Sequence, residues 1–229
     1  EYVLNGVDPL RAYALPPPVA SPSEGGAERT ERGEGWRLLF LGRMDSLKGG
    51  GILLDSLPRV AEALGVPLHV VFGGDGPARK AWERKAAAVR SRTPTVEVEF
   101  TGWIEGARLE SLWGRTDLLV VPSVWPEPFG LVGPEAGVRG VPAVGFQVGG
   151  IPDWLEEGVN GSLAPADPPT AQGLAAAIIR VLGDPTRYAA LQRGARERAR
   201  RFSQDRHLRA LSAIFQEVLG GVGPGPARP

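Results

Sequence analysis

The chain has 229 residues, 42% of them hydrophobic, which is enough for one sizeable globular domain. Its 26 basic and 26 acidic side chains balance, so charge gives no indication of nucleic acid as a partner, and the absence of cysteine excludes disulfides and thiolate sites. Two isolated histidines, His69 and His207, predict no metal site, and no apolar run reaches the roughly 20 residues that span a bilayer. We expect a soluble, cytoplasmic protein.

The two ends of the chain differ in composition from the rest. Residues 1–35 include "LPPPVASPSEGGAERTERGEG", which is rich in Pro, Gly, Ser and charge, so we expect a flexible interdomain connector. Residues 220–229 have the same character and predict a flexible tail. Between them, residues 36–183 predict one ligand-binding domain, and residues 184–219 predict C-terminal helices.

From Trp36 onward, short apolar runs alternate with helical patterns, which is typical of βα units around a parallel sheet. The predicted strands are WRLLFLG (36–42), PLHVVFG (67–73), TVEVEF (95–100), DLLVVPS (117–123), VPAVGF (141–146) and, more weakly, GSLAP (161–165). Helices are expected at about 50–64, 77–92, 106–114 and 131–139, with a kink or break at Pro58 in the first. The pattern predicts an α/β fold with a Rossmann-like parallel sheet flanked by helices.

Three helical stretches follow the sheet, near 170–182, 185–200 and 204–219. The last has one apolar face, formed at helical spacing by Leu208, Leu211, Ile214, Phe215, Val218 and Leu219. That face needs a partner surface. The arginines of "RGARERARRF" have two interpretations, an anionic-membrane patch or a solvated helix face, and their interleaving with Glu197 and alanines favours the second.

The loops after the strands carry the unusual residues. Ligands of open parallel sheets bind at the carboxyl ends of the strands. The first three loops are GRMDSLKGG with Gly42, Arg43 and Lys48, GGDGP with Gly74, and TGWIEGA with Trp103 and Ile104. Their glycine spacing fits neither a P-loop nor the G-x-G-x-x-G of dinucleotide binders. We therefore expect a ligand site of another kind at this edge.

The fourth loop, "PSVWPEPFGLVGPEA", places Glu127 and Glu135 on either side of a glycine-containing turn that leads into a helix. The free N–H groups of such a helix start, together with the basic pair of the first loop, suit a diphosphate. Each residue alone also has an ordinary explanation. Glu135 could complement a helix N-terminus, Lys48 could be a solvated lysine, and Trp103 and Trp125 could be packing residues. Their combination at this spacing favours a binding site.

In order and spacing, these loops together with "GVPAVGFQVGGIPDWLEEGVNG" and "RFS" resemble the carboxyl-terminal half of family-four retaining glycosyltransferases. The resemblance runs from about Trp36 to Phe202, and "NGVD" near the start is similar to the family's entry into this half. Its specific part is the E-x7-E element with Phe-Gly-Leu inside. The resemblance implies one half of a two-domain GT-B fold. The acceptor-binding amino-terminal domain would lie outside this chain, with residues 184–219 packing back on it.

The resemblance also implies a role for each residue at this edge. The implied catalytic residues are Arg43 and Lys48, which contact the donor's diphosphate, and Glu127, which reaches the hydroxyls of the transferred sugar. The implied substrate-binding residues are Gly42, Gly74, Trp103, Ile104, Phe129, Gly130, Leu131 and Glu135. Among these, Glu135 accepts hydrogen bonds from the ribose, and Trp103 and Ile104 approach the base. The implied substrate is a UDP- or GDP-linked sugar, with no cofactor and no metal.

The resemblance thus implies the donor-binding half of a retaining enzyme that acts by front-face attack, with little or no transfer by this half alone. Two alternatives stay open. One is a noncatalytic nucleotide-sugar-binding module that works with another subunit. The other is half of a nucleotide-sugar epimerase, which the E-x7-E element and the residues around it disfavour. Many family members build cell-envelope polysaccharide or glycolipid, so peripheral association with the cytoplasmic membrane face is a further expectation.

Overall fold

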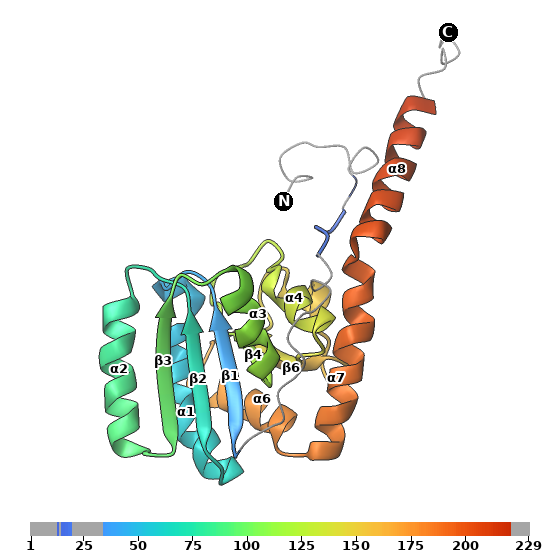
Figure 1. Cartoon of the computed structure of the whole chain (residues 1–229). Coiled ribbons are helices and arrows are strands. Elements are labelled where there is room, and N and C mark those ends of the chain that lie inside the picture. Colours follow the sequence, from blue (N-terminus) through green and yellow to red (C-terminus); the bar gives the residue numbers. More distant parts are fainter. Residues whose placement is uncertain (1–12, 14, 20–33, 221–229) are drawn as a thin grey trace.

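The computed structural model describes residues 13, 15–19 and 34–220. These residues form a six-stranded parallel sheet with helices on both faces, the α/β fold that the sequence predicts (Figure 1). The strands are β1 (Trp36–Leu41), β2 (Leu68–Gly73), β3 (Val96–Gly102), β4 (Leu118–Val121), β5 (Ala143–Phe146) and β6 (Gly161–Ala164). All six predicted strands are confirmed, including the weak last one.

The strand order is β3-β2-β1-β4-β5-β6, so the chain steps outward from β1 in one direction and from β4 in the other. β1 pairs with β2 along its whole length, from Trp36↔Leu68 to Leu41↔Gly73. β1 pairs with β4 only at Leu38↔Leu118 and Leu39↔Leu119. We call this contact the β1–β4 junction. Open parallel sheets bind ligands where the strand order reverses in this way, beyond the carboxyl ends of the strands.

The helices are α1 (Gly50–Leu64), α2 (Arg79–Arg92), α3 (Gly106–Arg115), α4 (Val132–Val138), α5 (Ile151–Trp154), α6 (Ala171–Leu182), α7 (Pro185–Ala199) and α8 (Gln204–Gly220), with 3-10 turns η2 (Ser46–Lys48) and η3 (Arg200–Phe202). α1 is not split at Pro58, because buried side chains on both sides of the proline, including Leu54 and Val60, hold the helix against the sheet. The sequence did not predict α5.

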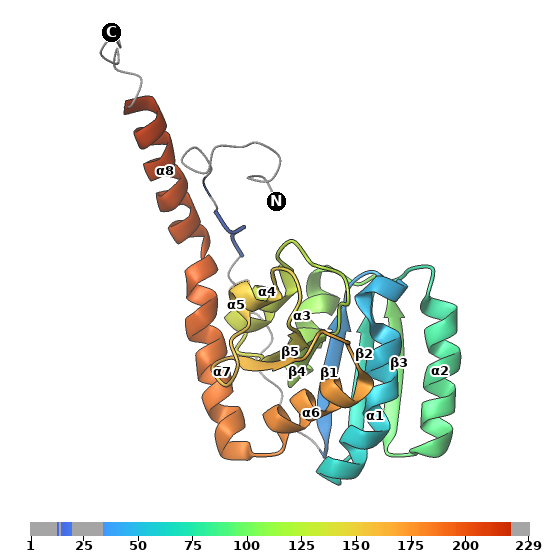
Figure 2. The ribbon, with the colours of Figure 1, turned by 180° about the vertical axis from the view of Figure 1, so that it is seen from behind.

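The sheet separates two apolar cores because successive side chains of a strand point to opposite faces. Leu38 and Leu118 belong to the core under α1, α2 and α6, whereas Leu39 and Leu119 belong to the core under α3, α4 and α5. Figure 2 shows the first of these helix layers in front of the sheet. Burial on both faces explains why the central strands have continuous apolar sequences.

The C-terminal helix α8 extends away from the sheet (Figure 1). Four apolar side chains of α8 are at least half exposed: Leu208 (51%), Phe215 (56%), Val218 (50%) and Leu219 (71%). At its base, the Val19 N–H donates to the carbonyl oxygen of Phe202 at 2.7 Å, so part of residues 15–19 contacts the C-terminal helices. Most of the predicted connector, and residues 221–229, lie outside the described residues.

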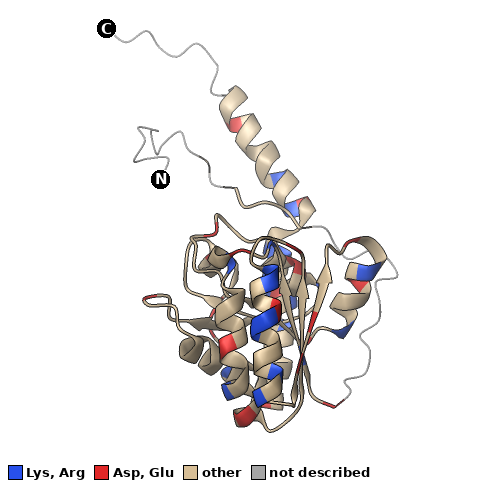
Figure 3. Cartoon of the chain, turned by 90° about the vertical axis from the view of Figure 1, so that its left-hand side faces the viewer, with Lys and Arg blue, Asp and Glu red and all other residues tan. Residues whose placement is uncertain are grey.

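Acidic and basic residues are interspersed on the face of the molecule that carries α2 (Figure 3). In the described part of the chain, no helix combines the length and the apolar composition needed to cross a bilayer.

Candidate functional site

The loops after β1, β2, β3 and β4 lie at one edge of the sheet (Figure 1). Backbone hydrogen bonds tie the first three loops together: Gly42 N–H to Gly73 O (2.9 Å), Met44 N–H to Asp75 O (2.8 Å) and Gly74 N–H to Gly102 O (2.8 Å). Gly74 has a φ of +124°, and a Cβ there would lie 2.1 Å from the carbonyl oxygen of Gly42. The close approach of two loops therefore requires this glycine, whatever ligand binds nearby.

The first loop presents Lys48 from a capped turn. The Asp45 carboxylate accepts hydrogen bonds from the backbone N–H groups of Leu47 (3.0 Å) and Lys48 (3.2 Å), which fixes η2 at its N-terminus. This is the usual function of an aspartate N-cap. The lysine side chain thus starts from an ordered backbone.

The same turn packs against the loop that follows β4. The Val124 N–H donates to the carbonyl oxygen of Leu47 at 2.9 Å. Gly49 has a φ of +67°, and a Cβ there would lie 1.8 Å from the carbonyl oxygen of Pro122. Two segments far apart in the sequence therefore meet backbone to backbone beyond the carboxyl end of the β1–β4 junction.

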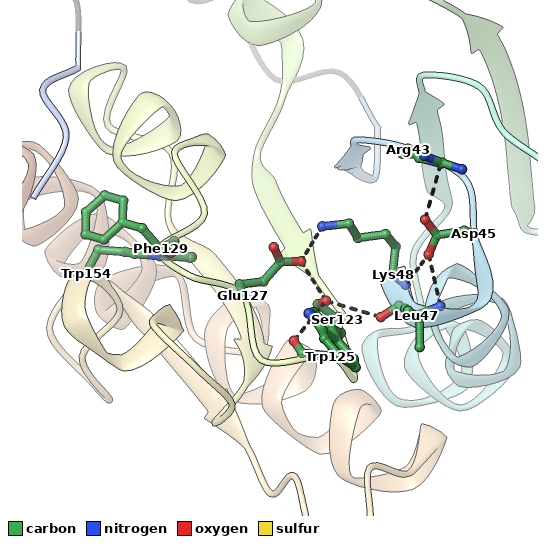
Figure 4. A network of polar contacts seen from close by, with 9 residues as sticks. All are labelled: Arg43, Asp45, Leu47, Lys48, Ser123, Trp125, Glu127, Phe129 and Trp154. Carbon is green, nitrogen blue, oxygen red and sulfur yellow. Dashed lines mark hydrogen bonds and ion pairs between the residues drawn. The ribbon is translucent and has the colours of Figure 1, made fainter. Parts of the chain in front are cut away.

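Lys48 and Glu127 meet across this contact. The Lys48 Nζ lies 2.5 Å from Oε1 of Glu127, and the Ser123 hydroxyl lies 2.7 Å from the same oxygen (Figure 4). The Lys48 and Glu127 side chains are 32% and 12% exposed. Partial burial reduces the solvent screening of this ion pair, and the desolvation of both charges opposes that gain.

Arg43 is placed differently from Lys48, although the sequence pairs them. Its side chain is 72% exposed, and its Nε lies 3.5 Å from the Asp45 carboxylate. The structure therefore shows one cation within the cluster of Lys48, Ser123 and Glu127 and a second cation at its rim. In the described residues, no hydrogen bond or ion pair links Arg43, Trp103 or Glu135 to this cluster.

The loop after β5 supports the backbone of Glu127 and Phe129 from behind. The Gly150 N–H donates to the carbonyl oxygen of Glu127 at 2.6 Å, and the Trp154 indole N–H donates to that of Phe129, also at 2.6 Å. A Cβ on Gly149 would lie 2.5 Å from the Glu127 backbone nitrogen. The sequence analysis did not predict this contact. The adjacent Gly149 and Gly150 are the signal that could have indicated it, because glycine often marks a place where another backbone approaches closely.

The turn before α4 contains Gly130, with a φ of +86°, and Leu131, which is 42% exposed. α4 begins at Val132 without a side chain that caps its first turn. A Cβ on Gly133 would lie 2.3 Å from the Trp154 ring, so α4 packs closely on α5. The backbone of this turn is therefore accessible on one side and supported on the other.

Glu135 lies in the first turn of α4 and is partly buried. Burial raises the pKa of its carboxyl, Arg139 opposes the rise, and Glu110 adds to it. The Arg139 guanidinium pairs with the Glu110 carboxylate at 2.5 Å and donates to the backbone oxygen of Glu135 at 2.8 Å. Within the described part of the chain, no group donates a hydrogen bond to the Glu135 carboxylate. A partly buried carboxylate without donors is suited to receive them from a ligand.

The third loop exposes Trp103. Its side chain is 76% exposed, and its indole N–H donates to the Glu105 carboxylate at 3.1 Å. Trp125 on the fourth loop is 55% exposed, so neither indole is packed in the core of the described residues. Ile104, in contrast, is half-buried and lines a cavity of about 430 Å³ between β3 and α3.

In the described ranges, no three His, Asp or Glu side chains are grouped so that they could hold a metal ion. The site consists of the partly buried Lys48–Glu127 ion pair, the partly buried carboxylate of Glu135, and an exposed arginine and an exposed indole around a glycine-containing turn.

Residues 35–184 match the sequence profile of the family described as "Glycosyl transferases group 1". The chain belongs to this glycosyltransferase family. It is 32% identical over 197 residues to a D-inositol 3-phosphate glycosyltransferase of Streptomyces bingchenggensis, covering 80% of this chain and 41% of that protein. It is also 32% identical over 234 residues to a glycogen synthase of Mycobacterium tuberculosis, covering 99% of this chain and 50% of that protein.

This glycosyltransferase chain thus spans half or less of the length of these two curated relatives. Among solved structures, it resembles Anabaena Alr3699/HepE in complex with UDP, with a TM-score of 0.67, 26% identity, and coverage of 80% of this chain and 49% of that one. HepE has also been solved in complex with UDP-glucose. The fold is the Rossmann-like sheet of GT-B glycosyltransferases.

Proposed function

We propose that this chain binds a nucleoside diphosphate sugar at the carboxyl edge of its sheet and forms the donor-binding half of a sugar-transferring enzyme. The observation that carries the proposal is the Lys48–Glu127 pair beyond the carboxyl end of the β1–β4 junction, in a chain that belongs to a glycosyltransferase family. The position is the one where open parallel sheets bind ligands. One cation and one carboxylate there match the two ends of a sugar diphosphate.

Lys48 and Arg43 would bind the diphosphate. The Lys48 backbone is fixed by the Asp45 cap, so only its partly buried side chain has to turn from Glu127 to face an anion. Fixed positive charge stabilises the negative charge that grows on a leaving diphosphate. The exposed Arg43 guanidinium would close on the phosphates from the rim, where its planar donors suit phosphate oxygens.

Glu135 would accept hydrogen bonds from the ribose hydroxyls. Its carboxylate is partly desolvated and has no donor among the described residues. Two hydroxyl donors would replace the hydrogen bonds from water that burial removes. The accessible turn backbone from Phe129 to Leu131 would lie against the phosphates and the sugar. Glycine at position 130 allows a close approach there.

Trp103 would contact the base. An indole that is 76% exposed offers a flat apolar surface on the third loop, and aromatic side chains stack on nucleobases. Because HepE binds UDP and UDP-glucose, uridine is the first base to test.

The proposed reaction retains the configuration of the sugar and uses no metal. The acceptor hydroxyl attacks the anomeric carbon on the face that the diphosphate leaves, the bond from that carbon to the phosphate oxygen breaks, and the leaving oxygen takes the acceptor's proton. Glu127 holds the sugar, and no protein side chain forms a bond to it. Acceptor contacts would come from a further domain, and the exposed apolar side chains of α8 offer a surface for it.

The test is calorimetric titration of this chain with UDP, GDP and ADP. We expect one of them to bind, and Lys48→Ala and Glu135→Ala to weaken it by about 1–3 kcal/mol each, the range for hydrogen bonds to charged groups. Lys80→Ala is the matched control because Lys80 is an exposed lysine on α2. Absence of binding by all three nucleotides at millimolar concentration would overturn the proposal.

A further inference from the structure

Ser123 is a buried serine at the contact between the loops that carry Lys48 and Glu127. It is 1% exposed. Its Oγ lies 2.7 Å from Oε1 of Glu127, 3.2 Å from the carbonyl oxygen of Leu47 and 3.4 Å from that of Trp125 (Figure 4). The hydroxyl has one proton for these three acceptors, and the short bond to the carboxylate is the strongest. Ser123 therefore donates to Glu127.

Ser123 and Lys48 contact the same oxygen of Glu127, Oε1 (Figure 4). Within the described residues, no group donates to the other oxygen, Oε2. The Glu127 carboxylate is thus fixed through one oxygen, and the second oxygen keeps its full capacity to accept hydrogen bonds.

We propose that Ser123 is a positioning residue that orients Glu127 toward the hydroxyls of the donor's sugar. The inference rests on the proposed function, in which Lys48 turns from Glu127 to the diphosphate. Once Lys48 does so, the Ser123 hydroxyl is the donor that still holds Oε1. It keeps this position because it is buried and because the adjoining Val124 N–H fixes the loop to Leu47 at 2.9 Å.

The experiment compares two dissociation constants in each variant, one for UDP and one for UDP-glucose. We expect Ser123→Ala to raise the ratio of the UDP-glucose constant to the UDP constant about tenfold, since a hydrogen bond to a charged group is lost at the sugar end only. Glu127→Gln calibrates the size of the sugar-dependent effect. If UDP does not bind but GDP or ADP does, the ratio is measured with that nucleotide and its glucose ester.

Ser56→Ala is the matched control. Ser56 is also 1% exposed, and its Oγ donates to the carbonyl oxygen of Leu53 at 2.6 Å within α1, away from the site. We expect Ser56→Ala to leave the ratio unchanged and to show the melting-temperature effect of losing a buried hydroxyl. If Ser123→Ala does not fold, Ser123→Cys preserves the volume with a weaker donor and should raise the ratio in the same direction.

A structural role for Ser123 would raise both dissociation constants by the same factor, and that result would overturn the inference. A ratio that stays unchanged in Ser123→Ala and in Glu127→Gln would overturn it as well. If UDP still binds the unaltered chain in that case, the proposed nucleotide site is not affected by this result. Failure of all three nucleotides to bind the unaltered chain would overturn the proposed function and the role of Ser123 with it.

Discussion

The Nζ of Lys48 lies 2.5 Å from Oε1 of Glu127, although 79 positions separate the two residues in the sequence. Without a ligand, each charge is the other's partner. A diphosphate that binds Lys48 must therefore compete with Glu127. The ion pair holds both side chains in the site. Breaking it would use part of the free energy of diphosphate binding.

This competition predicts opposite effects for the two members of the pair. Lys48→Met should weaken UDP binding because the cation is lost. Glu127→Gln should leave UDP binding unchanged or tighten it severalfold, because removing a competing partner recovers about 1 kcal/mol or less. UDP-glucose should bind Glu127→Gln more weakly. Calorimetry with both ligands checks this, and the control is Glu62→Gln, which removes an exposed charge on α1. Weaker UDP binding by Glu127→Gln would contradict the competition.

The raised pKa of Glu135 predicts a pH dependence of nucleotide affinity. Burial raises this pKa, so the carboxyl takes up a proton as the pH falls sooner than an ordinary glutamate does. In the proposed complex, the ribose hydroxyls donate to the ionised form. Affinity should therefore be constant above the raised pKa and fall as the pH drops through it. Glu135→Gln should bind about 1–3 kcal/mol more weakly at neutral pH and lose this dependence. The same pH dependence of nucleotide affinity in the unaltered chain and in Glu135→Gln would exclude Glu135 as its origin.

The same shift predicts that Glu135→Gln stabilises the free chain. A folded-state pKa above the unfolded value means that the ionised group opposes folding, so its destabilising effect is present above the folded-state pKa and absent below the unfolded-state pKa. Thermal unfolding at neutral pH should show a higher melting temperature for Glu135→Gln, and at acid pH the two proteins should converge. A lower melting temperature at neutral pH would mean that the carboxylate has a structural partner.

The contact between the first and fourth loops can be tested with two glycines of almost equal φ. Gly49 and Gly65 have φ values of +67° and +64°, so alanine brings a similar left-handed strain of about 1–2 kcal/mol at either position. Only at Gly49 would the Cβ meet a backbone atom, at 1.8 Å from the Pro122 carbonyl oxygen, whereas at Gly65 it meets none within 4 Å. Gly49→Ala should lower the free energy of unfolding by at least about 2 kcal/mol more than Gly65→Ala in urea. Equal losses of unfolding free energy in the two variants would show that the first and fourth loops can move apart at little energetic cost.

Trp103 and Trp125 provide a pair for testing base contact. Both are exposed, so neither substitution to alanine should change the melting temperature by more than a degree or two. Trp103→Ala should weaken nucleotide binding by about 1–3 kcal/mol, the usual value of a base stacked on an aromatic ring. Trp125→Ala should leave UDP affinity as it is. The reverse order would place the base beside the fourth loop.

The sequence predicts the sheet well because most strands are short apolar runs next to glycine or proline, and β3 alternates apolar residues with glutamate. It places the ends of the long helices within about two residues; α2, for example, begins at Arg79 and was predicted from 77. It does not predict α5, since four residues are too few to show a helical period.

The candidate site is less predictable than the fold. The charges at Lys48, Glu127 and Glu135 can be found from their positions after strands, but the sequence pairs Lys48 with Arg43, whereas the structure pairs it with Glu127. Gly49 resembles any loop glycine until the Pro122 carbonyl is placed beside it. Ser123 carries no signal because a serine after a strand is common, and only the folded chain brings it to Leu47 and Glu127.

The β1–β4 junction has a consequence for how binding can be observed. Two residue pairs join β1 to β4, so the two halves of the sheet are linked by fewer interstrand hydrogen bonds here than between β1 and β2. A molecule that bridges the first and fourth loops would act as an additional link between the halves. Amide hydrogen exchange should then slow in Leu38, Leu39 and Leu119 more than in β3 or β6, which makes this junction an internal reporter of occupancy that needs no activity assay.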